Sequence, residues 1–150
     1  MAQQNLQWGV IGTGAIATDF ATALQTSERC RIVNVTSFPG LAQPFAAKFG
    51  VPRATDSLDE LLGDAEVQAV YVATPHPQHE KLALAAIAAG KHVLVEKPMS
   101  TSAAAAGRII EAARQKRVFL MEAYMYRCHP LLTELISRLR GSVIGQIRHV

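Results

Sequence analysis

Three consecutive residues, Glu96, Lys97 and Pro98, carry the clearest chemical signal in this sequence, because they follow directly on the apolar run His92–Val95. A strand that ends in this way places an amine at the carboxyl edge of a parallel sheet, where open α/β sheets bind their ligands. An amine there can hydrogen-bond a reacting hydroxyl and stabilise a developing alkoxide. The alternative is that Lys97 forms a surface ion pair with Glu96. Lys97 is therefore the candidate catalytic and substrate-orienting residue.

A second signal for the same sheet edge stands near the start of the chain. The apolar run Leu6–Ile11 leads into Gly12-Thr13-Gly14-Ala15-Ile16-Ala17, which fits the pattern G-x-G-x-x-A. Glycines in such a turn let the backbone approach a pyrophosphate, and the following helix offers free N–H groups to the phosphates. The alternative is a purely structural turn. The pattern predicts a dinucleotide site that uses Gly12, Thr13, Gly14, Ala15 and Ile16.

The choice of dinucleotide depends on the end of the second strand, where an NAD site commonly carries Asp or Glu. No acid occurs from Arg29 to Thr55. Ser37 stands where a hydroxyl could bond the ribose or its 2′-phosphate, and Phe38 follows in place of the arginine that a 2′-phosphate favours. A carboxylate at this position would repel the 2′-phosphate of NADP, and none is present. We therefore expect the site to bind NADP or NAD, with a slight preference for NADP. Phe38 is a candidate to pack on the adenine.

Two histidines follow the β-prone run Val67–Ala73, in the segment Thr74-Pro75-His76-Pro77-Gln78-His79. A turn at this position lies across the crevice from the glycine loop, beside the expected nicotinamide. His79 could hydrogen-bond backbone or ligand, or simply belong to the first turn of a surface helix. His76 is more constrained because it lies between two prolines. The candidate cofactor-binding residues here are Thr74, Pro75, His76 and His79.

The length and composition of the chain exclude several classes of protein. A chain of 150 residues, 49% of them apolar, can bury one good core. Its longest apolar run, Leu82–Ala89, is too short to cross a bilayer, and the first residues lack the features of a signal peptide. Cys30 and Cys128 match no metal-ligand spacing. We expect a cytoplasmic protein with two free thiols, no metal site and no membrane association.

Basic residues gather in the last third of the chain. From Arg108 onward eight Lys and Arg face three acids, while the net charge of the whole chain is +3. Such a bias can indicate nucleic-acid binding. Because these residues occupy helix-like surface positions without interleaved aromatics, we expect no nucleic acid, and instead a solvated face or one turned toward phosphorylated ligands.

Apolar runs of strand length alternate with segments of helix length. The predicted strands are Leu6–Ile11, Arg31–Thr36, Val67–Ala73, His92–Val95 and Val118–Met121. The predicted helices are Ala15–Gln25, Leu41–Phe49, a short one starting at Asp56–Glu60, Pro77–Ala89, and one from Ser100 or Thr101 to Lys116. Short turns imply parallel pairing and right-handed crossovers. We therefore predict an α/β fold, a doubly wound, mostly parallel Rossmann sheet with helices on both faces.

The end of the chain departs from this alternation. Pro130–Arg140 has a helical pattern, and Gly141–Val150 turns into another strand that has no partner. We expect residues 1–125 to form the nucleotide-binding domain and residues 126–150 the linker helix and first strand of a second domain. The linker helix carries an apolar face formed by Leu131, Leu135, Ile136 and Leu139. The isolated chain either stays monomeric or self-associates through this face.

In the motifs described above, the chain resembles the Gfo/Idh/MocA oxidoreductases. The resemblance covers essentially all 150 residues and keeps the family's order and spacing. It rests on the glycine loop, Thr74-Pro75 with His79, Gly90–Pro98 and Ile144–Arg148. The segment Met121–Pro130 is similar to that of the branch with D-xylose dehydrogenases and dimeric dihydrodiol dehydrogenases. The family's Ser-Arg pair after the second strand stands here as Ser37-Phe38.

The resemblance implies a Rossmann domain that binds NAD(P), followed by an α+β domain. It implies hydride transfer between nicotinamide and a carbinol carbon of a sugar, polyol or related diol. Lys97 is then the catalytic lysine, and Glu96 and Lys97 are both cofactor-binding residues. Glu122, Tyr126 and Arg127 would approach the substrate. A second acid/base would come from beyond residue 150, so the isolated chain should turn over little. The full-length protein is expected to be a homo-oligomer.

Two other functions are weighed against this one. A non-enzymatic module that senses NAD(P) or docks a protein would need no amine beside the nicotinamide, so the intact Glu96-Lys97-Pro98 argues against it. Short-chain dehydrogenases carry a Tyr-x-x-x-Lys pair. None of Tyr71, Tyr124 and Tyr126 has a lysine four residues later.

Overall fold

The computed structural model describes residues 5–141, 143, 145 and 146 of the chain. Of the strand expected over Gly141–Val150, residues 142, 144 and 147–150 lie outside the described part, and the described residues Gly141, Val143, Gly145 and Gln146 are not in a strand. Within the described part, no helix combines the length and the apolar character needed to cross a membrane.

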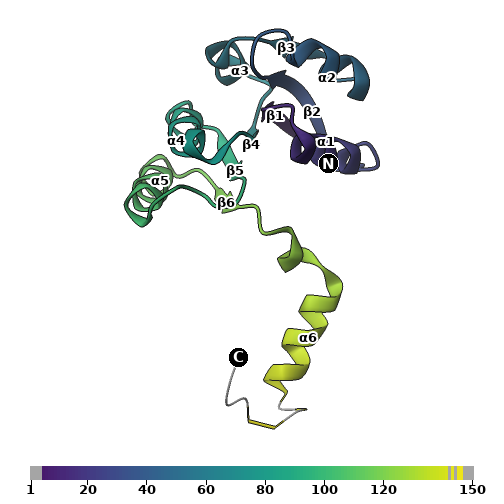
Figure 1. Cartoon of the computed structure of the whole chain (residues 1–150), viewed down its shortest axis with the longest axis vertical. Helices are drawn as coiled ribbons and strands as arrows, with labels where there is room; N and C mark the ends of the chain where they lie inside the picture. Colours follow the sequence, from purple (N-terminus) through teal and green to yellow (C-terminus); the bar gives the residue numbers. More distant parts are fainter. Residues whose placement is uncertain (1–4, 142, 144, 147–150) are drawn as a thin grey trace.

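A parallel sheet of six strands forms the centre of the molecule, in the order β3-β2-β1-β4-β5-β6 (Figure 1). Every pairing between these strands is parallel. The order reverses between β1 and β4, which is the switch point where doubly wound sheets bind ligands. The predicted doubly wound Rossmann sheet is confirmed. The strands are β1 (Leu6–Ile11), β2 (Cys30–Thr36), β3 (Arg53–Thr55), β4 (Ala69–Val72), β5 (His92–Val95) and β6 (Leu120–Glu122).

The helices follow the strands in the expected alternation. Ser57 and Ser102 cap α3 and α5 by accepting a hydrogen bond from the backbone N–H three residues on, and Gly50 ends α2 in the left-handed conformation. The helix predicted from Pro77 begins instead with a 3₁₀ turn. The helical segments are α1 (Ala15–Leu24), α2 (Ala42–Phe49), α3 (Leu58–Gly63), η1 (His76–Gln78), α4 (His79–Ala88), α5 (Ala103–Lys116), η2 (Met125–Cys128) and α6 (Pro130–Arg140).

Two hydrophobic cores cover the two faces of the sheet. On β4, Val70 and Val72 pack with α3, α4 and α5, whereas Tyr71 packs with α1 and α2. On β1, Ile11 belongs to the first core and Val10 to the second. The near-continuous apolar strands therefore reflect a sheet covered on both sides, as predicted.

Helix α6 lies apart from this body. It extends away from the sheet beyond β6 (Figure 1), and none of its residues is buried. Its boundaries agree with the predicted helix. Leu131, Leu135 and Ile136 are exposed by 70%, 47% and 40%, so the predicted apolar face is open to solvent.

Candidate functional site

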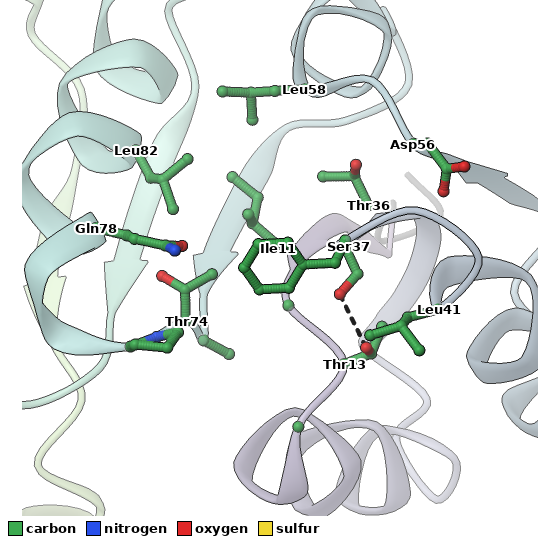
Figure 2. Close-up of a pocket in the computed structure, with 15 residues that line it drawn as sticks. Ile11, Thr13, Thr36, Ser37, Leu41, Asp56, Leu58, Thr74, Gln78 and Leu82 are labelled. Carbon is green, nitrogen blue, oxygen red and sulfur yellow. Dashed lines mark hydrogen bonds between the residues drawn. The ribbon is translucent and has the colours of Figure 1, made fainter.

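A pocket of about 400 Å³ opens at the carboxyl ends of β1, β2 and β4, on the switch point of the sheet (Figure 2). Many of the residues proposed from the sequence meet there. Those that line the pocket are Gly12, Thr13, Gly14, Ser37, Phe38, Thr74 and Pro75. The candidates outside its lining are Ala15, Ile16, His76, His79, Glu96, Lys97, Glu122, Tyr126 and Arg127.

The turn between β1 and α1 depends on two glycines for different reasons. Gly12 has φ +105°, and a Cβ there would lie 2.4 Å from the carbonyl oxygen of Ala73, so only glycine fits. A Cβ on Gly14 would meet nothing within 4 Å. Gly14 is the N-cap of α1, which has no side-chain cap and no acid in its first turn. The N-terminus of α1 is therefore open to an anion.

Two proposed residues stand in the first turn of α1. Ala15 is exposed as the first helical residue, and Ile16 is partly buried against the core of the α1 and α2 face. Their side chains do not line the pocket, so what this turn can offer a phosphate is its backbone N–H groups.

Thr74 supplies a polar group that the protein itself leaves unsatisfied. Its Oγ1 is buried and has no hydrogen-bond partner among the described residues. Thr74 lies on the α4 side of the pocket (Figure 2). A buried hydroxyl is unfavourable unless a ligand or water satisfies it. Together with the open α1 N-terminus, this hydroxyl makes the pocket fit a dinucleotide.

The opposite side of the pocket comes from the turn after β2. The hydroxyls of Thr13 and Ser37 are 2.9 Å apart and hydrogen-bonded, which ties this turn to the glycine loop. Phe38 lines the pocket with 59% of its surface exposed, so its ring is available to a planar ligand.

Several lining residues were not proposed from the sequence. Asp56 stands directly after β3, a strand of three residues that was not predicted because it is too short to show a pattern. The others lie at strand ends or at the starts of the helices that follow, positions that a search of every strand end would have included. The lining residues missed are Ile11, Thr36, Leu41, Asp56, Leu58, Ala73, Gln78 and Leu82.

His79 connects the Thr74 segment, which lines the pocket, to the loop that carries Lys97. It is fully buried, with Nδ1 2.8 Å from the carbonyl oxygen of Pro98 and Nε2 2.7 Å from that of Thr74. The alternative of a surface helical residue is therefore wrong, and of the two partners considered the structure gives backbone. His76 is exposed and meets the His79 ring edge-on, with ring centroids 5.5 Å apart.

Glu96 is buried beneath the loop that carries Lys97. Its Oε1 accepts a hydrogen bond of 2.6 Å from the Tyr71 hydroxyl, and its Oε2 accepts one from the backbone N–H of Lys97. Burial, assisted by the bond to Glu96, raises the pKa of the Tyr71 phenol. Lys97 is exposed, and none of the ion pairs found among the described residues involves it. The surface ion pair with Glu96 is therefore not formed.

Glu122 joins the same loop from β6. Its Oε1 accepts a hydrogen bond of 2.7 Å from the backbone N–H of Met99, two residues after Lys97. Tyr126 and Arg127 lie on η2 and are exposed. The structure thus brings Glu122 to the lysine loop and leaves Tyr126 and Arg127 exposed, with the Tyr126 ring meeting that of Tyr124 edge-on at 5.6 Å between centroids.

The chain is similar to known oxidoreductases over nearly its whole length. A model of the Gfo/Idh/MocA oxidoreductase family, with an NAD-binding Rossmann fold, matches residues 6–124. The trans-1,2-dihydrobenzene-1,2-diol dehydrogenase of Mus musculus is 41% identical over 146 residues, which are 95% of this chain and 44% of that enzyme. The chain thus spans less than half the length of this relative.

Two solved structures have the same fold. A 3-ketoreductase from Actinomadura kijaniata, in complex with NADP and TDP-benzene, is 33% identical with a TM-score of 0.88, covering 97% of this chain and 45% of its own. An apo scyllo-inositol dehydrogenase from Lactobacillus casei has a TM-score of 0.89, covering 98% of this chain and 44% of its own. At its 23% identity, the likeness concerns the fold alone.

Proposed function

The chain belongs to the Gfo/Idh/MocA family of NAD-binding oxidoreductases, and from this premise we propose that it is the nucleotide-binding part of an NAD(P)-dependent dehydrogenase. The substrate is a small molecule with a carbinol carbon: a sugar, a polyol or a related diol. The similarity to a dihydrodiol dehydrogenase and to a 3-ketoreductase supports this substrate class.

The observation that carries the proposal is the pairing of an uncapped helix with an unsatisfied hydroxyl in one pocket. The first-turn N–H groups of α1 lack a side-chain cap, and Gly14 leaves open space in front of them. The buried Thr74 Oγ1 has no partner among the described residues, across the pocket from Ser37 (Figure 2). A dinucleotide supplies the anion and the polar groups that both features require.

In this proposal residues 1–125 form the nucleotide-binding domain, and residues 126–150 begin the substrate domain. The whole protein is a homo-oligomer located in the cytoplasm. The exposed apolar face of α6 supports the presence of a covering partner. The free thiols of Cys30 and Cys128 agree with a reducing compartment.

A bound nucleotide would supply the hydride acceptor or donor, and the residues of this chain would supply part of the groups that act on the substrate. Lys97, the catalytic residue, holds the substrate hydroxyl at Nζ and exchanges a proton with it. Glu96 and His79 act as positioning residues, because they hold the lysine loop against Tyr71 and against the Thr74 carbonyl. Glu122, Tyr126 and Arg127 orient the substrate from β6 and η2.

Isothermal titration of the chain with NAD⁺ and with NADP⁺ tests the binding part of the proposal. We expect saturable binding of at least one nucleotide. Gly14→Val should weaken it by at least about tenfold, because the new side chain fills the space that a pyrophosphate needs. The φ of −72° at Gly14 suits any residue, so this variant should fold.

Gly107→Ala is the matched control. Gly107 lies in α5, away from the pocket, and a Cβ there also meets nothing within 4 Å. Its nucleotide affinity should equal that of the unmodified chain. If neither nucleotide binds the unmodified chain, or if Gly14→Val binds as well as the control, the proposal fails.

A further inference from the structure

The β2 end of the pocket carries a negatively charged side chain, that of Asp56, which bears on the choice between NAD and NADP. NADP differs from NAD by a phosphate on the 2′-oxygen of the adenine ribose, and a phosphate monoester carries about −1.5 to −2 charges at pH 7. Among the residues that the structure describes, Asp56 is the one with a charged side chain in the pocket lining, and neither Lys nor Arg lines it. Resting on the proposed function, we infer that this chain selects NAD over NADP and that Asp56 is the residue that rejects the 2′-phosphate.

The register of the sheet explains why Asp56 reaches this position. Strand β3 pairs with β2 so that Thr55 lies opposite Thr36, the last residue of each strand. The next residue of each chain segment, Asp56 and Ser37, therefore emerge side by side at the carboxyl edge. Ser37 occupies the place where Rossmann domains hold the adenine ribose. Asp56 thus provides, from the neighbouring strand, the acid that NAD sites usually carry on β2 itself.

A hydrogen bond holds the Asp56 carboxylate near the β2–α2 turn. Its Oδ1 accepts from the backbone N–H of Gly40 at 3.3 Å. Asp56 lies on the same side of the pocket as Ser37 and Leu41, opposite Thr74 and Gln78 (Figure 2). One carboxylate oxygen is therefore committed to the turn, and the negative charge stays close to the ribose site.

The neighbouring residues cannot neutralise a phosphate. Phe38 and Leu41 are exposed by 59% and 51% where a 2′-phosphate would need a cation. Both side chains can cover the adenine, but neither donates a hydrogen bond. The hydroxyls of Ser37 and Thr13 bond each other and suit a ribose hydroxyl better than a dianion. The pocket thus lacks attraction for the 2′-phosphate and contains repulsion against it.

The preference for NADP expected from the sequence depended on the absence of acids from Arg29 to Thr55. Asp56 is the next residue in the chain, directly beyond this acid-free segment. The inference of NAD selection depends on strand pairing, which the sequence alone does not contain.

Titration calorimetry of the chain with both nucleotides, and with the probes 5′-AMP and adenosine 2′,5′-bisphosphate, tests this inference. We expect NAD⁺ to bind at least about tenfold more tightly than NADP⁺, with the same order for the two probes. The ratio should narrow as salt rises, because added ions screen the repulsion. Equal or tighter binding of NADP⁺ overturns the inference and leaves the proposed function intact. Binding of neither nucleotide overturns both.

Two variants and one control test whether Asp56 causes the preference for NAD⁺ over NADP⁺. Asp56→Asn keeps an acceptor for the Gly40 N–H but removes the charge, so the affinity for NADP⁺ should rise relative to that for NAD⁺. Leu41→Arg should raise NADP⁺ affinity further by pairing with the phosphate. Asp59→Asn, an exposed acid on α3 outside the pocket lining, should leave the ratio unchanged. A ratio that Asp56→Asn does not move overturns the role of Asp56.

Discussion

At the scale of single residues, Glu96 and Lys97 are neighbours in sequence with opposite environments. Glu96 is 6% exposed and holds two hydrogen bonds, one to the Tyr71 hydroxyl and one to the backbone N–H of Lys97. Lys97 is exposed. A buried carboxylate therefore positions the backbone of the proposed catalytic lysine, while the amine stays accessible to a substrate.

Removing the Tyr71 hydroxyl should show how much its hydrogen bond to Glu96 contributes to the free energy of unfolding. Tyr71→Phe leaves one oxygen of a buried carboxylate without its donor, and we expect a loss of about 1–3 kcal/mol in the free energy of unfolding. Urea denaturation measures this loss. Tyr126→Phe is the control, because Tyr126 is 58% exposed on η2 and should change stability by less than about 0.5 kcal/mol. Equal stabilities for the two variants would contradict the role given to Tyr71.

At the scale of elements, Asp64 ties together the edge of the sheet and the end of α3. Its Oδ2 accepts hydrogen bonds from Asn34 Nδ2 on β2 at 2.9 Å and from Arg53 Nε on β3 at 2.7 Å. Its Oδ1 accepts from the backbone N–H of Glu66. Burial disfavours the charged carboxylate, but these hydrogen bonds and the charge of Arg53 outweigh it and hold the pKa of Asp64 below its ordinary value of 3.8.

This depressed pKa predicts an acid-sensitive contribution to stability. The folded state favours the ionised carboxylate, so the contribution is fully present above the unfolded pKa near 3.8 and is lost as pH falls through the lower folded pKa. Free energies of unfolding measured from pH 5 to about pH 2 should fall more steeply for the unmodified chain than for Asp64→Asn. Asp59→Asn, which replaces an exposed acid, should keep the steep fall. A parallel fall for Asp64→Asn and the unmodified chain would refute the prediction.

At the scale of the whole molecule, one body built on the sheet carries the nucleotide pocket, and α6 extends from it with an exposed apolar face (Figure 1). Tyr126 and Arg127 are likewise exposed on η2, between the sheet and α6. The proposed substrate residues therefore lie at the border of the body, where the second domain proposed here would complete the substrate site.

This arrangement predicts that the chain binds nucleotide without catalysing substrate oxidation at an appreciable rate. The 150-residue chain should bind nucleotide but oxidise diols or sugars at no more than a trace rate, since half of the proposed substrate site is missing. In a full-length protein with the proposed dehydrogenase activity, Lys97→Ala should lower kcat by about 10²–10⁴. It should leave nucleotide affinity unchanged, because Lys97 does not line the pocket. Lys116→Ala, a substitution at the end of α5, is the control. A complete protein whose Lys97→Ala variant keeps full turnover would favour the sensing module instead.

Local patterns in the sequence were sufficient for most of the elements. The boundaries of β1, β5 and α6 agree with the predicted ones, because each is an unbroken apolar or periodic run between strong stop signals. The glycine turn was also recognisable, since Gly12, Gly14 and Ala17 follow the first strand directly at the spacing of a dinucleotide-binding turn. These features depend on residues close together in the chain.

Features that depend on segments far apart in the chain were decided only by the tertiary structure. The short strand β3 exists because it pairs with β2, and that pairing brings Asp56 beside Ser37. The burial of Glu96 requires Tyr71 on the neighbouring strand, and the burial of His79 requires the Pro98 carbonyl. In each case the partner of a polar group is set by the register and packing of the sheet. The sequence alone therefore determined the fold class and the proposed location of the nucleotide site, whereas the tertiary structure decided which charges and hydrogen bonds surround that location.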